Sequence, residues 1–240
     1  AGEVRVDGEM VHKSSTQVAP DAEIAVKQRP KYVSRGGKKL AAAIEAFDVE
    51  PAGKVGADVG ASTGGFTDCL LQNGAEKVYA IDVGYGVLYW KLRKDPRVVV
   101  MERTNARYLE SLPEPVELVT IDASFISLSL LLPAVKGWFD GGKGQTIALI
   151  KPQFEAGRKA AAVHAGVIKD EEVHAQVLEE TLASAVALGF HPVGLIPSPI
   201  TGPKGNVEFL VDLRLSKGDY SLDRQEMIAR ALENTPEQPR

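Results

Sequence analysis

Strand-length apolar segments alternate with helix-length segments over most of this chain, and this alternation constrains the fold more than any other feature. Seven strands are predicted, at 54–60, 77–83, 97–101, 116–122, 145–151, 192–197 and 207–215. Helical stretches are predicted at about 38–47, 65–73, 86–94, 127–139 and 170–188. Strands separated by helices form a parallel sheet that is covered on both faces. Only a Pro- and Gly-containing loop, 198–205, separates the last two strands, which predicts an antiparallel final strand.

The remaining sequence divides into short segments around this α/β domain. Alternating runs at 3–6 and 23–26 predict a hairpin that is too small to hold a core of its own. We expect a basic linker at 27–31, the α/β domain at 32–217 and a polar tail at 218–240. Cys69 is the single cysteine, and neither a signal peptide nor a bilayer-length apolar run is present. These features predict a cytoplasmic protein without an intrachain disulfide.

A glycine-rich loop, Gly60–Phe66, lies between the first strand of the domain and a helix. Glycines allow the backbone to approach a ligand closely, while the N–H groups at the start of the helix point at it. Asp82 ends the next strand, where a carboxylate can accept both hydroxyls of a ribose. Together with Asp58 before the loop, this pattern predicts a site for an adenosine-containing cofactor.

Three other interpretations of the loop are weaker. A P-loop requires Lys where Phe66 stands, and a dinucleotide site requires a glycine where Ser62 stands. Gly60–Gly64 also matches the Gly-x-Ser-x-Gly nucleophile elbow of hydrolases. That fold places several strands and an oxyanion loop before its nucleophile, whereas only a helix and a small hairpin precede this loop.

Charged side chains lie at or next to several apolar strands, at positions where a hydrophobic core would disfavour them. Asp122 ends one apolar strand, Lys151 ends another, Lys39 begins a helix, and Glu208 lies on the final strand. The carboxyl ends of parallel strands form the binding crevice of an open α/β sheet. We therefore expect these two acids and two lysines to converge on the same cleft as the glycine loop.

Positive charge is concentrated near the N-terminus, although the whole chain has a net charge of −4. Residues 1–39 carry eight Lys or Arg against five Asp or Glu. Such a basic segment is either a solvated linker or a phosphate-binding surface. The candidates for contact with nucleic acid are Arg5, Lys27, Arg29, Arg35 and Lys38.

Five ordered motifs make the chain resemble the TlyA (haemolysin A) family of 2′-O-methyltransferases, which is related to FtsJ. These motifs lie at 32–40, 58–68, 102–107, 149–155 and 198–206, and the likeness covers essentially residues 1–215. The resemblance implies a class I S-adenosylmethionine-dependent methyltransferase fold, which is Rossmann-like. It also implies a catalytic tetrad of Lys39, Asp122, Lys151 and Glu208, with Lys38 as a competitor for the first position.

The resemblance further implies the substrate, the cofactor contacts and an RNA-binding segment. The expected reaction is methylation of a ribose 2′-hydroxyl, with cytidine the expected nucleotide, in ribosomal RNA or ribosomal subunits. Residues 1–26 resemble the second half of an S-four-type RNA-binding module. The residues expected to hold S-adenosylmethionine are Asp58, Gly60, Ser62, Gly64, Gly65, Phe66, Asp82, Asn105 and Asp122.

Two other functions remain open from the sequence. The first is a membrane-active haemolysin, which the older family name implies. The second is a protein that binds the cofactor and RNA without catalysing methyl transfer. The four histidines are scattered without metal-ligand spacing, so no metal site is expected.

Overall fold

The computed structural model describes residues 4–13, 15–26, 30–156, 167–216 and 223–235. The chain forms two compact units, Ala1–Lys31 and Tyr32–Arg240. The smaller unit is an antiparallel sheet in which β1 (Val4–Val6) lies between β2 (Glu9–Val11) and β3 (Ile24–Val26). The two runs that we expected to pair do so, with Val4 opposite Val26, and β2 is an additional strand. None of the residues described between 4 and 26 is buried, so this unit has no core.

The larger unit contains the predicted seven-stranded sheet, in the order β6-β5-β4-β7-β8-β10-β9. All neighbouring strands are parallel except that β10 is antiparallel to both β8 and β9, which confirms the predicted fold class. The strands are β4 (Val55–Val59), β5 (Lys77–Ile81), β6 (Val98–Met101), β7 (Leu118–Ile121), β8 (Gly144–Ile150), β9 (His191–Pro197) and β10 (Phe209–Leu215).

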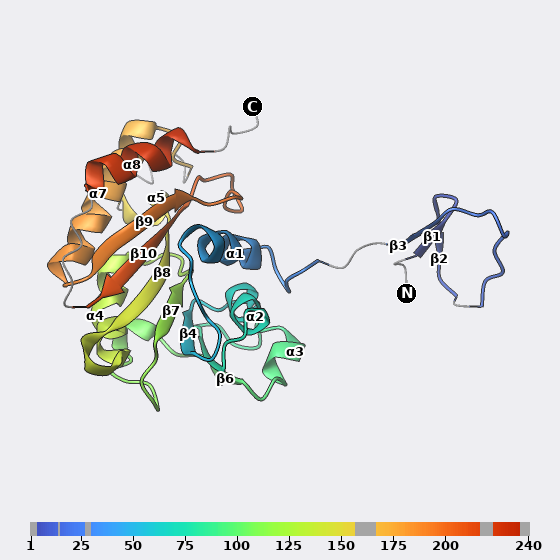
Figure 1. Cartoon of the computed structure of the whole chain (residues 1–240), viewed down its shortest axis with the longest axis horizontal. Helices are drawn as coiled ribbons and strands as arrows, with labels where there is room; N and C mark the ends of the chain where they lie inside the picture. Colours follow the sequence, from blue (N-terminus) through green and yellow to red (C-terminus); the bar gives the residue numbers. More distant parts are fainter. Residues whose placement is uncertain (1–3, 14, 27–29, 157–166, 217–222, 236–240) are drawn as a thin grey trace. The chain divides into compact units, whose positions relative to one another are not determined.

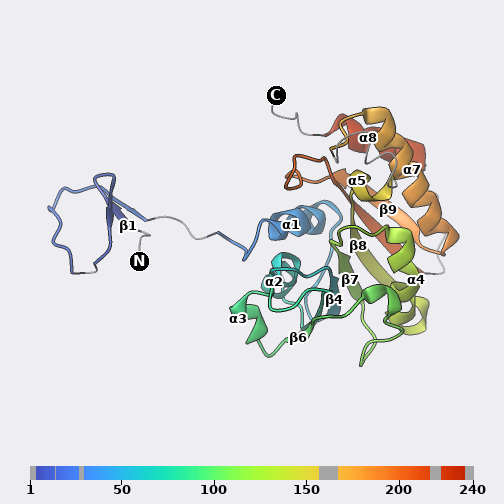
Figure 2. The ribbon, with the colours of Figure 1, turned by 180° about the vertical axis from the view of Figure 1, so that it is seen from behind.

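Helices cover both faces of this sheet (Figures 1 and 2). One face packs against α1 (Gly36–Ala46), α2 (Gly65–Gln72) and α3 (Trp90–Arg93). The other face packs against α4 (Leu128–Trp138), α7 (Glu171–Ala187) and α8 (Arg224–Glu233). The remaining short helices are η1 (Ala106–Tyr108), η2 (Asp140–Gly142) and α5 (Pro152–Glu155).

Side chains that alternate along each central strand separate two hydrophobic cores. In β8, Ile147 and Leu149 face the α1–α2 side, whereas Ala148 and Ile150 face the α4–α7 side. All four are at most 2% exposed. A strand buried on both faces is mostly apolar along its whole length, and this explains why strand-length apolar segments identified these strands.

The C-terminal segment differs from the predicted polar tail, because part of it is the helix α8. Its hydrophobic positions, Met227, Ile228, Ala231 and Leu232, have helical spacing, and Asp223 caps the helix by accepting a hydrogen bond from the backbone N–H of Gln225. Ile228 and Ala231 are buried, and the helix packs on α7 and β9. The many charges of this segment concealed its single apolar face. The helix predicted at 86–94 is shorter than expected and comprises only α3.

Candidate active site

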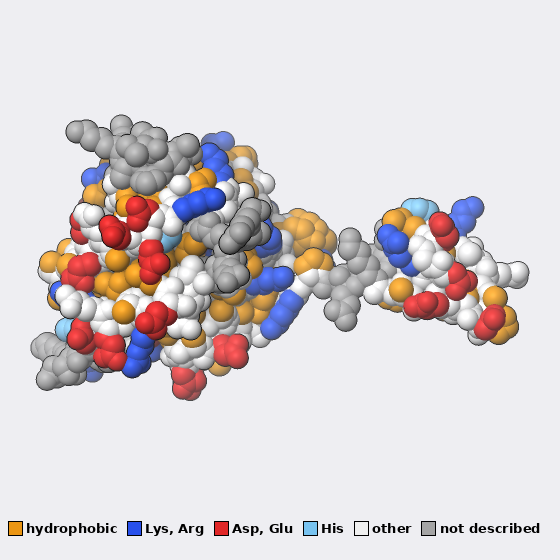
Figure 3. Space-filling model, turned by 90° about the horizontal axis from the view of Figure 1, so that it is seen from above, with side chains coloured by type: hydrophobic (Ala, Val, Ile, Leu, Met, Phe, Trp, Pro, Cys, Tyr) orange, Lys and Arg blue, Asp and Glu red, His pale blue; other side chains and the backbone are white. Residues whose placement is uncertain are grey.

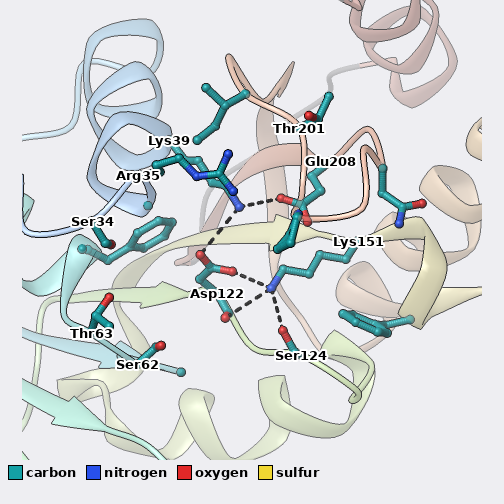
Figure 4. A pocket seen from close by; sticks show the side chains of 18 of the residues that line it. Ser34, Arg35, Lys39, Ser62, Thr63, Asp122, Ser124, Lys151, Thr201 and Glu208 are labelled. Carbon is teal, nitrogen blue, oxygen red and sulfur yellow. Dashed lines mark hydrogen bonds and ion pairs between the residues drawn. The ribbon is translucent and has the colours of Figure 1, made fainter. Parts of the chain in front are cut away.

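The topology of the sheet brings four charged side chains to one end of it. Asp122 follows β7 and Lys151 follows β8, so both lie at the carboxyl ends of parallel strands. Glu208 immediately precedes β10. Because β10 is antiparallel to β8, the start of β10 lies beside the end of β8, with Phe209 opposite Ile150. Lys39 reaches the same point from the first turn of α1 (Figure 4).

The four groups alternate in charge. The Lys39 ammonium lies 2.6 Å from a Glu208 carboxylate oxygen and 3.9 Å from Asp122. The other oxygen of Asp122 lies 2.5 Å from the Lys151 ammonium, which also donates to the Ser124 hydroxyl at 3.1 Å. Lys39, Lys151 and Glu208 are each at most 7% exposed. Burying such charges is costly unless opposite charges compensate them, and here each cation has a carboxylate partner.

The structure distinguishes the two candidate lysines on α1. Neighbouring helical residues point about 100° apart, so only one of Lys38 and Lys39 can face the sheet. Lys39 is buried against Glu208, whereas Lys38 is exposed. Lys39, which the family motif favoured over Lys38, is therefore the lysine that reaches the charged cluster.

The cluster lies in a cavity of about 1050 Å³, a size suited to a nucleoside-sized ligand and its reaction partner. The glycine loop forms one side of the cavity, through Gly60, Ser62, Gly65 and Phe66. Several other lining residues had not been singled out as site residues, although most of them lie within the motifs at 32–40, 58–68, 149–155 and 198–206. These are Ser34, Thr63, Ser124, Phe125, Gln153, Phe154, Thr201, Lys204 and Asn206.

Two features of the cavity rim have the character of a binding site. Phe125 is 89% exposed, adopts a left-handed backbone conformation (φ 64°), and its ring centre lies 4.8 Å from that of Phe154. A large apolar side chain in this exposed and strained conformation suits ligand contact better than folding. The Gln153 side-chain oxygen is buried and has no hydrogen-bond partner among the described residues.

The glycine loop needs its glycines for close approach as well as for backbone conformation. Gly60 has φ 81°, and a Cβ atom there would lie 2.8 Å from the Asp122 carbonyl oxygen. Gly64 has φ 94° at the N-cap of α2, and a Cβ there would lie 2.8 Å from Leu88. Among the residues expected to hold the cofactor, Gly64 is packed behind the loop and is not one of the cavity-lining residues.

Asp58 lies below the loop and does not reach the cavity. Its fully buried carboxylate accepts hydrogen bonds from the Thr67 backbone and hydroxyl, at 2.8 and 2.6 Å, and from the Thr120 hydroxyl at 3.2 Å. Burial raises the pKa of this carboxyl to about 7, because the charged form loses its hydration. This geometry assigns Asp58 to positioning the loop and α2, and not to direct contact with a ligand in the cavity.

Asp82 lies beside the cavity-lining part of the loop, whereas Asn105 lies at the start of η1, and neither is one of the cavity-lining residues. The two Asp82 oxygens accept the backbone N–H groups of Ser62 and Gly84, at 2.8 and 2.7 Å. Each carboxylate oxygen has a second lone pair, so Asp82 can still accept ribose hydroxyls. The exposed Asn105 caps η1 by accepting the Arg107 backbone N–H.

The predicted RNA contacts are distributed over both units. Arg35 lines the cavity, and Lys38 is exposed one helical turn further along α1. Arg5 is exposed in the smaller unit, where its guanidinium donates to the Gly8 carbonyl. Lys27 and Arg29 lie outside the described residues.

Two further site types find no support in the part of the chain that the structure describes. No three His, Cys, Asp or Glu side chains there are grouped so that they could hold a metal ion. None of the described helices combines the length and hydrophobicity that a membrane crossing requires.

Comparisons with known proteins agree on one family. Residues 32–215 match the sequence profile of the FtsJ-like methyltransferases. The 16S/23S rRNA (cytidine-2′-O)-methyltransferase TlyA of Mycobacterium tuberculosis is 44% identical over 98% of this chain and 90% of its own length. Hemolysin A of Brachyspira hyodysenteriae is 40% identical over 88% of each chain. A solved structure of a Streptococcus thermophilus protein named as a hemolysin is 42% identical in sequence to this chain. It superposes with a TM-score of 0.79 and covers 97% of this chain and 87% of its own.

Proposed function

The chain belongs to the FtsJ-like methyltransferase family, and from this we propose that it transfers a methyl group from S-adenosylmethionine to a ribose 2′-hydroxyl of ribosomal RNA. One observation carries the proposal: Lys39, Asp122, Lys151 and Glu208 form an alternating charged cluster inside the cavity beside the glycine loop. The Mycobacterium tuberculosis relative is named for cytidine 2′-O-methylation of 16S and 23S rRNA. We propose cytidine as the target nucleotide here as well.

The residues around the glycine loop fit S-adenosylmethionine. Gly60 and Gly65 line the cavity and carry no side chain, so a ligand can approach the loop backbone closely. Asp82 lies beside this loop with free lone pairs for ribose hydroxyls, while Phe66 and Ser62 line the adjoining cavity. When bound, the cofactor supplies a methyl group that is already activated on a sulfonium.

The chemistry left for the protein is to orient the 2′-hydroxyl and to remove its proton. Asp122 and Ser124 hold the Lys151 nitrogen in the cavity. In its neutral amine form, Lys151 can hydrogen-bond the hydroxyl and accept the proton as the oxygen attacks. Lys39, held by Glu208, can contact the ribose or an adjacent phosphate. Because the donor is already activated, positioning of the two reactants supplies much of the rate.

RNA must reach this cavity, and two regions are proposed to guide it there. Arg35 lines the cavity just before α1, Lys38 is exposed on α1, and the small β1–β3 unit carries Arg5. The exposed Arg5 and Lys13 side chains of that unit are available for contact with phosphates. We propose ribosomal RNA, within a ribosomal subunit or free, as the partner.

Lys151→Met tests the catalytic assignment. We expect methyl transfer to ribosomal RNA to fall by about 10²–10⁴-fold, because the group that accepts the proton is lost. Transfer is measured as 2′-O-methylcytidine by mass spectrometry after nuclease digestion of the RNA. The matched control is Lys143→Met, which removes an exposed lysine at the opposite end of β8.

Calorimetric titration with S-adenosylhomocysteine shows whether each variant still folds and binds the cofactor product. Lys151→Met should bind it nearly as well as the wild type. Methyl transfer that stays within a few-fold of the wild type in Lys151→Met would refute the role of Lys151. Methylation on a base, with no 2′-O-methylcytidine, would refute the proposed reaction.

A further inference from the structure

The segment that follows β5 and β6 exposes several large aromatic side chains. Tyr85 is 68% exposed, Trp90 55% and Tyr108 72%. Burying such rings is normally favourable, so several exposed rings in one short region are unusual for a protein surface. They lie between residues 83 and 108, in the loops at the carboxyl ends of β5 and β6 and in the short helices α3 and η1.

The same segment is strongly basic in an otherwise acidic chain. Residues 83–108 contain six Lys or Arg and two Asp or Glu, a net charge of +4, whereas the whole chain has −4. The view in Figure 3, which looks down on the α8 side, shows carboxylates spread over another face of the larger unit. Positive charge is therefore locally concentrated, as on surfaces that meet phosphates.

The two acids of the segment neutralise two of its arginines. Glu102 pairs with Arg93, and Asp95 pairs with Arg97 at 2.9 Å. The remaining four cations have no carboxylate partner within the described residues, and each lies over an aromatic ring. Arg103 lies 4.2 Å from the centre of the Tyr85 ring, Arg107 5.4 Å from Tyr108, and Lys94 and Lys91 lie 5.3 and 5.8 Å from Trp90.

This surface adjoins the candidate active site through direct contacts. The Tyr89 backbone N–H donates to the Thr63 carbonyl at 3.2 Å, and Thr63 lines the cavity. Leu88 and Leu92 pack against Gly64 from the same side. The backbone N–H of Arg103 donates to Gly84, whose own N–H donates to Asp82. A polymer bound here would therefore lie next to the glycine loop.

We propose that Tyr85, Trp90, Lys91, Lys94 and Arg103, which we term the aromatic–basic face, dock single-stranded RNA that flanks the nucleotide in the cavity. Glu102 connects the two parts of this face, because it accepts from the Gly86 backbone N–H and pairs with Arg93 of α3. This inference rests on the proposed function, because it assumes an RNA substrate. Exposed rings stack on unpaired bases, and unpaired cations beside them neutralise the backbone. The charge favours RNA over a protein partner, because a nucleic-acid backbone supplies a phosphate at every nucleotide to match these cations.

The test is binding of a fluorescein-labelled single-stranded oligocytidylate, measured by fluorescence anisotropy. Trp90→Leu keeps apolar bulk but removes the stacking ring, and should weaken binding about tenfold. Trp90→Phe keeps a ring and should weaken binding less. Arg103→Gln should lower the slope of log Kd against log salt by ~0.7. The matched control, Lys143→Gln, removes an exposed cation just before β8, at the opposite end of the sheet, and should leave binding unchanged.

Three further measurements decide between explanations. S-adenosylhomocysteine affinity should be unchanged in Trp90→Leu, so a loss of it would overturn the assignment to RNA. RNA affinity equal to that of the wild type in both Trp90→Leu and Arg103→Gln would also overturn it. Sedimentation velocity tests a second copy of the chain: a wild-type dimer that Trp90→Leu dissociates would assign the face to self-association instead.

The outcomes separate this inference from the proposed function. If wild-type protein transfers no methyl group to RNA but the variants lose RNA binding as stated, the docking surface stands and the proposed reaction fails. If methyl transfer is observed and the variants bind and methylate RNA as the wild type does, the reaction stands and the docking surface fails.

Discussion

At the scale of single residues, the buried Asp58 carboxyl couples the glycine loop to pH. Its pKa is raised to about 7 by burial, against an ordinary value of 3.8. Between these values the folded protein binds a proton that the unfolded chain releases, so stability falls as pH rises. We expect the free energy of unfolding of the wild type, relative to Asp58→Asn, to fall by up to ~4 kcal/mol from about pH 4 to above pH 7.

Urea unfolding followed by circular dichroism across this pH range measures the effect. Asp140→Asn removes an exposed carboxylate instead and controls for the change in net charge. Parallel stability profiles for the wild type and Asp58→Asn would show that Asp58 does not titrate in this window. A titration midpoint near 7 in the carbon-13 spectrum of the Asp58 carboxyl would confirm it independently.

Residue-level prediction from the sequence succeeded for the charged residues at the strand ends and was incomplete elsewhere. Lys39, Asp122, Lys151 and Glu208 were expected in one cleft, and the structure brings them together. Asp58 was expected to contact the cofactor but lies beneath the loop, because sequence spacing does not distinguish a strand's buried face from its open end. The exposure of Phe125 and the orphaned oxygen of Gln153 are tertiary properties, so no sequence pattern indicated them.

At the scale of elements, the junction between β4 and α2 depends on Gly64. Its φ of 94° favours glycine, and a Cβ would collide with Leu88 and Leu92. Gly86 also has a positive φ, of 72°, but open space where its Cβ would lie. Gly64→Ala should therefore lower the free energy of unfolding by ~2–4 kcal/mol, and Gly86→Ala by only ~1 kcal/mol.

Urea unfolding measures the free energy of unfolding of both variants. Gly86→Ala introduces backbone strain without a collision, so the difference between the two variants gives the cost of the collision at Gly64. Because Leu88 and Leu92 precede or belong to α3, the larger substitution should also displace the loop and weaken S-adenosylhomocysteine binding. Equal destabilisation in the two variants would mean that the leucines move aside without cost.

Prediction of elements was most accurate for those buried on two sides. All seven strands of the large sheet were located, since most of their residues are apolar, as in the Ile147–Ile150 run of β8. The antiparallel β10 followed from the short loop before it, and it is this reversal that places Glu208 at the active end of the sheet. The helix α8 was missed because only one of its faces is apolar. The helix α3 is a single turn, and its one aromatic ring, Trp90, is exposed.

At the scale of the whole molecule, all buried hydrophobic residues described by the structure lie at or beyond Tyr32. The β1–β3 unit therefore contributes no described residue to the core of the methyltransferase domain, and the two units are compact separately. The alternation of strands and helices from residue 54 onwards predicted this larger domain. The N-terminal segment showed no such pattern, and its role in RNA binding was predicted only from its resemblance to an RNA-binding module. Folding and RNA recognition should consequently be separable.

A chain restricted to residues 32–240 tests this separation. It should retain the urea midpoint and the S-adenosylhomocysteine affinity of the full chain within about twofold, because the cavity and both hydrophobic cores lie within it. Its affinity for ribosomal RNA should fall, since Arg5 and the rest of the smaller unit are lost, while the aromatic–basic face should preserve a residual, salt-dependent affinity. Combining the truncation with Trp90→Leu should remove most of that remainder. If the truncated chain unfolds at much lower urea, the smaller unit stabilises the domain and the two functions are not separable.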